Sequence, residues 1–518
     1  MATTSDYLSE LVEQKTALAN NLVTKGVDAS ADEKFNSLVP KVLDIETSAK
    51  IPDEWSEEYY QSVLAKVPSF EELYAERDDS WLPFSEGGEN TATGLFLVEK
   101  NNADKTLEIG FQSNSKETYK ILTSIDGVNW NLFETGTIDT VNTAQLVEIN
   151  VADIVDEEAI TSSGEYQFLV RFECPNITHF RYGARCNTDE YRKVKLVEVD
   201  WNLPTMSGIA SNLNYGLAYR SYLKYVHNYI IGGNLVSSFY YCYSLKAIKN
   251  IYSDNSIKID LMFQGCYALE HIPFFDVSGV TESASSTFAG CRSLLTIPKL
   301  NFNNLPMASG RMFYDCIRLV TIPYINLSKD ESINCTEMFY FCYNLQLVPE
   351  IFKDLTIKTY ANTFSKCTSL KKVPELGDLS NCASYQKMLN ECCSIADTVL
   401  ELDTSVVTNA GCSGIYSTST KVLEIYNLLI PDSTNAVIAP SIYTERYTFN
   451  PNRVPETSTT TVDIGTAYSM KKSAIVEMLE SLPTITVART IKISGMLHYA
   501  DLSESDVAIA TEKGWTVA

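Results

Sequence analysis

The sequence predicts a multidomain protein with N-terminal helices, an antiparallel, jelly-roll-like β-sandwich, and a β-solenoid of short repeats with a C-terminal cap. Three observations support this prediction. Cysteine recurs every 24 to 26 residues from Cys242 to Cys392, seven short alternating runs precede that region, and a spaced apolar stripe opens the chain. A chain of 518 residues is too long for one hydrophobic core and suggests about three to four compact units.

The charge and the cysteine count argue against several function classes. The net charge of -24 repels nucleic-acid phosphates and anionic lipid. The first residues lack the pattern of a signal peptide, and no apolar run is long enough to span a bilayer. We therefore expect no nucleic-acid partner, no membrane insertion, and a protein made in the cytoplasm without export, with its 13 cysteines reduced.

Residues 1–50 are predicted to form a helical docking or oligomerisation segment. An amphipathic pattern ends at Gly26, and a shorter apolar segment interrupted by Pro40 follows it. Homo-oligomerisation, with a trimer as the first guess, would use the apolar stripe, although the stripe could equally pack on the chain's own next domain. The residues of this stripe are Leu8, Leu11, Leu18 and Leu22.

Residues 51–80 are predicted to be an acidic, aromatic helical linker without a core of its own, and residues 81–203 a β-sandwich. A hairpin turns at Asp126-Gly127 and ends at Trp130. This hairpin resembles that of discoidin-like, galactose-binding-type sandwiches, which often bind carbohydrate but also serve as spacers. The seven predicted strands are 95–98, 106–111, 119–123, 146–149, 166–172, 180–182 and 194–199.

Residues 204–400 are predicted to be the repeats. The unit reads Phe-x-x-Cys-x-x-Leu-x-x-Ile-Pro. Units this short must stack to bury a continuous apolar stripe. We expect a strand at Leu-x-x-Ile-Pro, a bend at the proline, and a single helical turn around Phe-x-x-Cys. Cysteines one per turn lack the clustered spacing of a metal site, so we expect them to be buried, small apolar side chains.

The turns from Met262 to Pro273 (MFQGCYALEHIP) and from Met312 to Pro323 (MFYDCIRLVTIP) resemble BspA-family leucine-rich repeats. Residues 401–518 are expected to hold degenerate repeats and the cap, with strands at 422–426 and 490–494 and a helix at 471–482. The last segment, a helix capped by Ser503 or Ser505 before a short strand, resembles the C-terminal caps of repeat proteins in tailed-bacteriophage virions. Residues 7–42 are similar to N-terminal segments of phage tail and fibre proteins.

We expect neither catalysis nor a cofactor nor a metal ion. The four histidines lie in no metal-binding or nucleophile motif, and neighbouring carboxylates are typical of a solvated surface. Tyrosines are abundant instead, at 30. A row of them along one face of the solenoid could bind a surface polysaccharide or another protein, although some will only pack between turns. The predicted row is Tyr240, Tyr267, Tyr314 and Tyr340.

These resemblances imply a phage virion component in a tail, fibre or baseplate appendage, with other virion proteins and a host-surface polysaccharide or protein as partners. Two alternatives remain open. One is a bacterial surface or secreted leucine-rich-repeat adhesin, and the other is a scaffold subunit within the virion that has no receptor role. An intracellular scaffold or a fragment of a carbohydrate-active enzyme is a weaker reading of the same repeats.

Overall fold

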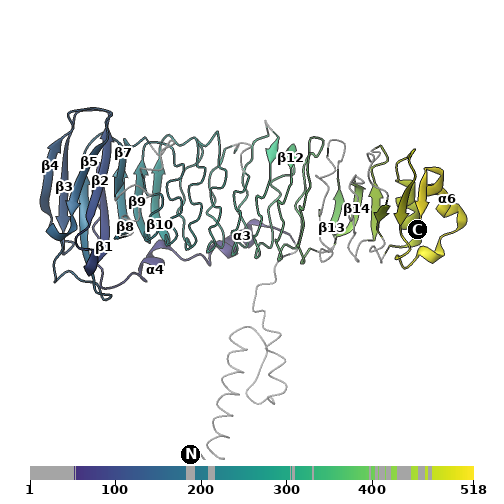
Figure 1. The fold of residues 1–518 in the computed structure, drawn as a ribbon, viewed down its shortest axis with the longest axis horizontal. Coiled ribbons are helices and arrows are strands. Elements are labelled where there is room, and N and C mark those ends of the chain that lie inside the picture. The colour runs from purple at the N-terminus through teal and green to yellow at the C-terminus, as the bar shows by residue number, and fades with distance from the viewer. Residues whose placement is uncertain are drawn as a thin grey trace, which may run out of the picture. The chain divides into compact units, whose positions relative to one another are not determined.

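The computed structural model describes residues 52, 54–182, 193–207, 216–303, 305, 310–329, 332–395, 398–402, 407, 415, 422–428, 445–452, 461–464 and 470–518 (Figure 1). All its helices and strands belong to one compact unit, Glu54–Ala518. The predicted N-terminal helices, with the stripe Leu8, Leu11, Leu18 and Leu22, lie outside the described residues.

The predicted β-sandwich is confirmed. Strands β4–β3–β6–β1–β8 form one antiparallel sheet and β5–β2–β7 another. Rings of the two sheets meet between them, since Phe172 lies 4.8 Å from both Phe111 and Phe180. The strands are β1 (Thr91–Glu99), β2 (Thr106–Ser113), β3 (Thr118–Ser124), β4 (Asn131–Thr137), β5 (Gln145–Asn150), β6 (Glu165–Glu173), β7 (Ile177–Tyr182) and β8 (Val194–Leu203), with short 3-10 turns η1 (Lys100–Asn102) and η2 (Val151–Asp153).

Strand β8 belongs to both the sandwich and the solenoid. It pairs antiparallel with β1 and, on its other edge, parallel with β9 (Tyr225–Ile231), which pairs in turn with β10 (Ala247–Ser253). The predicted border at residue 203 therefore falls at the end of a shared strand in one seven-stranded sheet. One hydrophobic core runs through both parts, and the sandwich covers the edge that the first repeat would otherwise expose.

Phenylalanine rings form a continuous stack inside the solenoid. The six predicted rings are buried, and their centroids lie 5.5–5.7 Å apart with planes within 14° of parallel. Each N–H of these phenylalanines donates to the next turn, to the carbonyl of the residue before the next member of the column. The stacked residues are Phe239, Phe263, Phe288, Phe313, Phe339 and Phe364.

The repeat cysteines are buried, as predicted, and they also bind the backbone. Each Sγ lies 3.0–3.2 Å from a carbonyl of the preceding turn, which is a phenylalanine carbonyl in six of the seven cases. Cys316, for example, donates to Phe288. Burial raises the pKa of these thiols, which keeps the proton needed for this bond. Cysteine thus combines a small apolar body with a weak donor.

The helical turn expected around Phe-x-x-Cys is absent from the described repeats, which form hydrogen-bonded turns there. The residue before each cysteine and the one four before that have positive φ, as Tyr241 and Ser237 do. The described repeats also have no strand where they contain Ile-Pro. Strand β10 forms at this register because Lys249 stands where the later turns have proline. The described turns from Pro273 to Pro374 have no strand there, since proline lacks the N–H that a strand ladder needs.

Residues 54–86 form a strap along this proline edge (Figure 1). The strap contains helices α3 (Glu57–Leu64) and α4 (Phe70–Tyr74), and both lie within the helical linker predicted for residues 51–80. It is held by the solenoid: Tyr60 Oη donates to the Ile297 carbonyl at 3.0 Å, and Trp55 Nε1 donates to the Ile322 carbonyl at 3.1 Å. Both carbonyls directly precede a proline, so the strap satisfies acceptors that the broken ladder leaves open.

The C-terminal region contains the predicted elements. Ser503 caps α6 with a capping box to Asp506, and Gly514, at φ +91°, ends the helix before the last strand. The remaining elements are parallel strands β11 (Ile333–Asn334) and β12 (Ile357–Thr359), then β13 (Thr398–Glu401), β14 (Val422–Leu428) and β15 (Arg446–Phe449), then β16 (Thr461–Asp463), β17 (Arg489–Lys492) and β18 (Trp515–Val517), with helices α5 (Lys472–Glu480) and α6 (Glu504–Glu512) and the 3-10 turn η5 (Tyr499–Asp501).

Candidate functional site

Aromatic side chains gather on the outside of the turns that bear the buried cysteines. Except for Tyr219, in the turn before Cys242, they occupy three positions: two before, one before and one after a cysteine. The cysteine itself and the phenylalanine three residues before it are buried. Tyr243, Tyr267 and Tyr343 are the most exposed, at 41%, 37% and 38%. We call this surface the tyrosine face. Its members are Tyr219, Tyr240, Tyr241, Tyr243, Tyr267, Tyr314, Tyr340, Phe341 and Tyr343.

The first aromatic cluster spans three successive turns. Tyr219 packs edge-on against Tyr240 at 5.3 Å, Tyr240 lies 4.2 Å from Tyr241, and Tyr241 lies 5.5 Å from Tyr243. Tyr243 then meets Tyr267 of the next turn at 5.1 Å. Contact thus passes from ring to ring across the turns, which gives an apolar surface edged with hydroxyl groups.

Glycine makes room for these rings at the position before the cysteine. A Cβ on Gly265 would lie 2.3 Å from the Tyr241 ring, and Gly265 has φ +78°. The Tyr267 ring similarly lies over Gly290, 3.4 Å from the site of a Cβ. Each ring therefore lies close against the backbone of the following turn, because glycine has no side chain there.

The second cluster lies further along the repeats. Tyr314 contacts Tyr340 at 5.7 Å and Phe341 at 6.0 Å, Tyr340 and Phe341 stack at 4.1 Å, and Phe341 lies 6.0 Å from Tyr343. The Lys366 ammonium lies 4.9 Å from the Phe341 ring centroid. Burial raises the pKa of Tyr314, so this phenol stays neutral and keeps its hydroxyl proton.

Two ion pairs, Arg292–Asp315 and Arg311–Glu337, connect the two clusters, and we call these four residues the saddle. The Arg292 guanidinium lies 4.6 Å from the Tyr267 ring centroid and donates to Asp315 at 2.7 and 2.8 Å. Arg311 stands 5.7 Å from the Tyr314 ring and pairs with Glu337 at 2.6 Å. The saddle therefore continues the flat surface with a guanidinium plane in the turn of Cys291, which has no aromatic ring at these three positions.

The structure divides the predicted row into two pairs. Tyr314 and Tyr340 touch directly, whereas Tyr240 reaches Tyr267 only through Tyr241 and Tyr243. The row combined two registers, because Tyr267 follows its cysteine while the other three stand two residues before theirs. The sequence prediction left Tyr219, Phe341 and Arg292 out of the surface. Counting from each cysteine would have found the last two.

A second polar cluster lies buried beneath the strap at β8. Glu198 is completely buried, and its carboxylate binds Arg77 Nε at 2.9 Å, His227 Nε2 at 2.6 Å and Tyr74 Oη at 2.5 Å. Burial raises the pKa of Asp200 in the same strand, which binds Asn228 and the Gly87 N–H. Since both carboxylates are saturated by protein donors, this cluster fastens the strap to the sheet.

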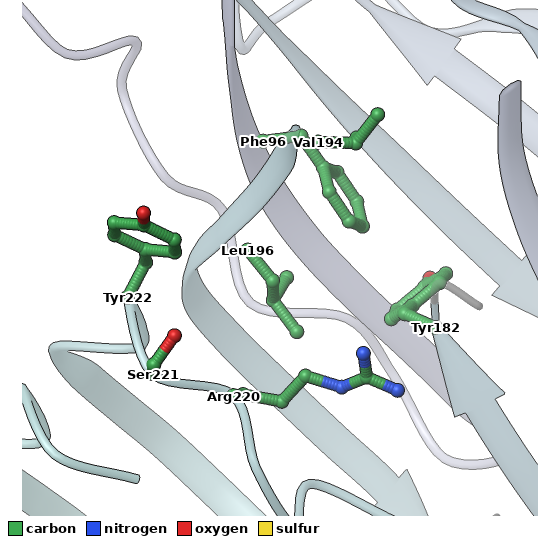
Figure 2. Close-up of a pocket in the computed structure, with 7 residues that line it drawn as sticks. All are labelled: Phe96, Tyr182, Val194, Leu196, Arg220, Ser221 and Tyr222. Atoms are coloured by element: carbon green, nitrogen blue, oxygen red, sulfur yellow. The ribbon is translucent and has the colours of Figure 1, made fainter. Parts of the chain in front are cut away.

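A cavity beside the sandwich is too small for a ligand (Figure 2). It measures about 10 Å³, about the volume that one water needs. Arg220 extends across it toward Tyr182. The lining residues are Phe96, Tyr182, Val194, Leu196, Arg220, Ser221 and Tyr222.

Within the described part of the chain, no group of three or more His, Cys, Asp or Glu side chains is arranged to hold a metal ion. No helix among the described residues is long and apolar enough to cross a membrane. Comparison with protein-family models finds no match, and comparison with curated proteins finds no similar sequence.

Proposed function

We propose that this chain is a non-enzymatic structural and adhesive protein of a tailed-phage virion, part of a tail, fibre or baseplate appendage, which contacts the host surface through the tyrosine face. The likeness of the repeats to BspA-type leucine-rich repeats, and of both chain ends to phage virion segments, supports the virion assignment. The N-terminal segment would dock on other virion proteins or assemble copies of the chain.

The main support for an adhesive role is the tyrosine face itself. Tyrosine offers flat, amphipathic contact area that loses little conformational freedom on binding. Soluble proteins rarely leave large contiguous apolar patches exposed without an interaction to explain them. Because the rings rest on a stacked core and on Gly265 and Gly290, the surface is held in shape before any ligand arrives.

The location can be tested with antibodies against the full chain. Immunogold labelling of an appendage on purified virions, with the chain's peptides found in those particles by mass spectrometry, would support the proposal. Labelling of bacterial cell surfaces with none on virions would replace it with the alternative, a bacterial surface or secreted adhesin.

Adhesion can be tested with the labelled full chain and host cells. Replacing Tyr243, Tyr267 and Tyr343 by alanine should abolish attachment, because it removes the most exposed rings of both clusters. Alanine at Phe274 and Tyr324, exposed at 59% and 48% but outside the tyrosine face, is the matched control and should attach normally. If the triple variant attaches as well as the unmodified chain, attachment uses a surface other than the tyrosine face. If the unmodified chain is found on virions but does not attach to host cells, it is a scaffold subunit without a receptor role.

A further inference from the structure

We infer that the tyrosine face binds a single chain of an uncharged polysaccharide, which lies along the solenoid axis and contacts both aromatic clusters at once. This inference rests on the proposed adhesive function and specifies its ligand. It follows from the shape of the surface, from its charge and from the saddle between the clusters.

The shape of the surface favours an extended chain. All members of the tyrosine face except Tyr219 occupy the three positions around a repeat cysteine, so the face is narrow across the turns and long along the axis. Ring contacts proceed from turn to turn, from Tyr219 to Tyr267 and again from Tyr314 to Tyr343. The flat C–H face of a pyranose can lie on such a ring, while the sugar hydroxyls at its rim reach neighbouring polar groups.

The charges of the surface favour an uncharged ligand. Three cations that lie beside rings of the face are each paired with an anion of a neighbouring turn: Arg292 with Asp315, Arg311 with Glu337, and Lys366 with Glu391 at 3.7 Å. These three pairs carry no net charge, and the chain as a whole carries -24. The net negative charge of the chain would therefore repel a polyanionic polysaccharide, and these three cations already have anionic partners.

The saddle favours one long ligand over two short ones. Its guanidinium and carboxylate groups donate to and accept from sugar hydroxyls, so a chain can cross from Tyr267 to Tyr314 without losing contact. A chain that reaches both clusters binds the second one intramolecularly. We expect it to bind on the order of 100-fold more tightly than a fragment that fits one cluster.

The experiment uses the envelope polysaccharide of the host to which the full chain attaches. It is separated by anion exchange into neutral and acidic fractions, and each is partially hydrolysed and graded by length. Calorimetry with the full chain should show binding of the neutral fraction, with the long fragments binding about 100-fold more tightly than the short ones. Tyr267→Ala and Tyr343→Ala, one in each cluster, should each reduce the affinity for long fragments to that for short ones. Tyr324→Ala should leave both affinities unchanged.

Tighter binding of the acidic fraction would overturn the ligand class, and equal affinity at all lengths would overturn the axial arrangement. If no polysaccharide fraction binds although intact cells bind through the tyrosine face, the ligand is a surface protein. The inference then fails while the proposed function stands. If intact cells do not bind at all, the proposed function fails with it. Tyr267→Phe and Tyr343→Phe, which keep the rings, should bind long fragments tightly and guard against loss by misfolding.

Discussion

Removing one ring from the phenylalanine stack should destabilise the solenoid more than any surface change. Phe313 is completely buried between Phe288 and Phe339, with ring centroids 5.5 Å away on both sides. Phe313→Ala should cost about 3–5 kcal/mol through lost burial and the cavity left behind. Two stacked pairs are also lost, each worth about 0.5–1.5 kcal/mol, so we expect the upper end, about 5 kcal/mol.

Urea unfolding of the full chain, followed by hydrogen exchange of the turns on either side, measures this cost. Phe313→Leu is the matched control, because the seventh turn has Leu389 at the same register and buries it completely. We expect this control to cost about 1.5 kcal/mol. The stacking argument is refuted if Phe313→Ala costs less than about 1 kcal/mol, or no more than the surface change Tyr324→Ala.

Three further predictions concern the strap, the thiols and the cap. Tyr60→Phe leaves the buried Ile297 carbonyl without its donor and should lower the free energy of unfolding by about 1–3 kcal/mol in urea; no change would mean that water replaces the hydroxyl. In the native chain Cys316 should resist alkylation, because burial raises its pKa, whereas the exposed Cys393 should react. Mass spectrometry of the labelled peptides measures both reactions, and rapid labelling of Cys316 in the native chain would contradict its burial. The hydrogen bond and ion pair with Lys472 and the helix cap at Ser503 lower the pKa of Asp506 from 3.8 to about 2. The ionised Asp506 therefore stabilises the cap fully above about pH 4, and this stabilisation is lost as the pH falls toward 2. Near-UV circular dichroism should show this loss, and Asp506→Asn should abolish its pH dependence.

Much of the fold could be predicted because its signals are local in the sequence. Phenylalanine, cysteine and leucine recur at fixed spacing, so their inward direction followed from the period alone. The sandwich strands showed alternating patterns, and the terminal helix showed its cap at Ser503. These elements depend on neighbours within one turn or one strand.

The parts that could not be predicted depend on distant partners. Glu198 and Asp200 in β8 have the alternating pattern of a solvated strand face, yet both are completely buried beneath the strap. Their burial requires Arg77, which lies 121 residues before Glu198, and His227, which lies 29 residues after it. Nothing near β8 in the sequence indicates these partners, so neither the shared sheet nor the packing of the strap on it could be predicted.

The candidate site was partly predictable for a related reason. Tyrosine content and variable positions pointed to the surface that we propose as the site, and all four predicted residues take part in its ring contacts. Which rings touch depends on the backbone conformation of each turn, in which the residue before each cysteine has a positive φ. Composition and spacing do not encode this backbone detail in residues such as Tyr241, where no glycine marks it.

Hydroxyl-radical footprinting of the full chain, with and without saturating host envelope material, tests the central claim most directly. The account predicts that Tyr243, Tyr267 and Tyr343 lose reactivity together when the ligand is bound, while Tyr252 and Tyr324, exposed at 54% and 48% elsewhere, remain as reactive as before. Protection of Tyr252 or Tyr324 with the tyrosine face still fully reactive would contradict it.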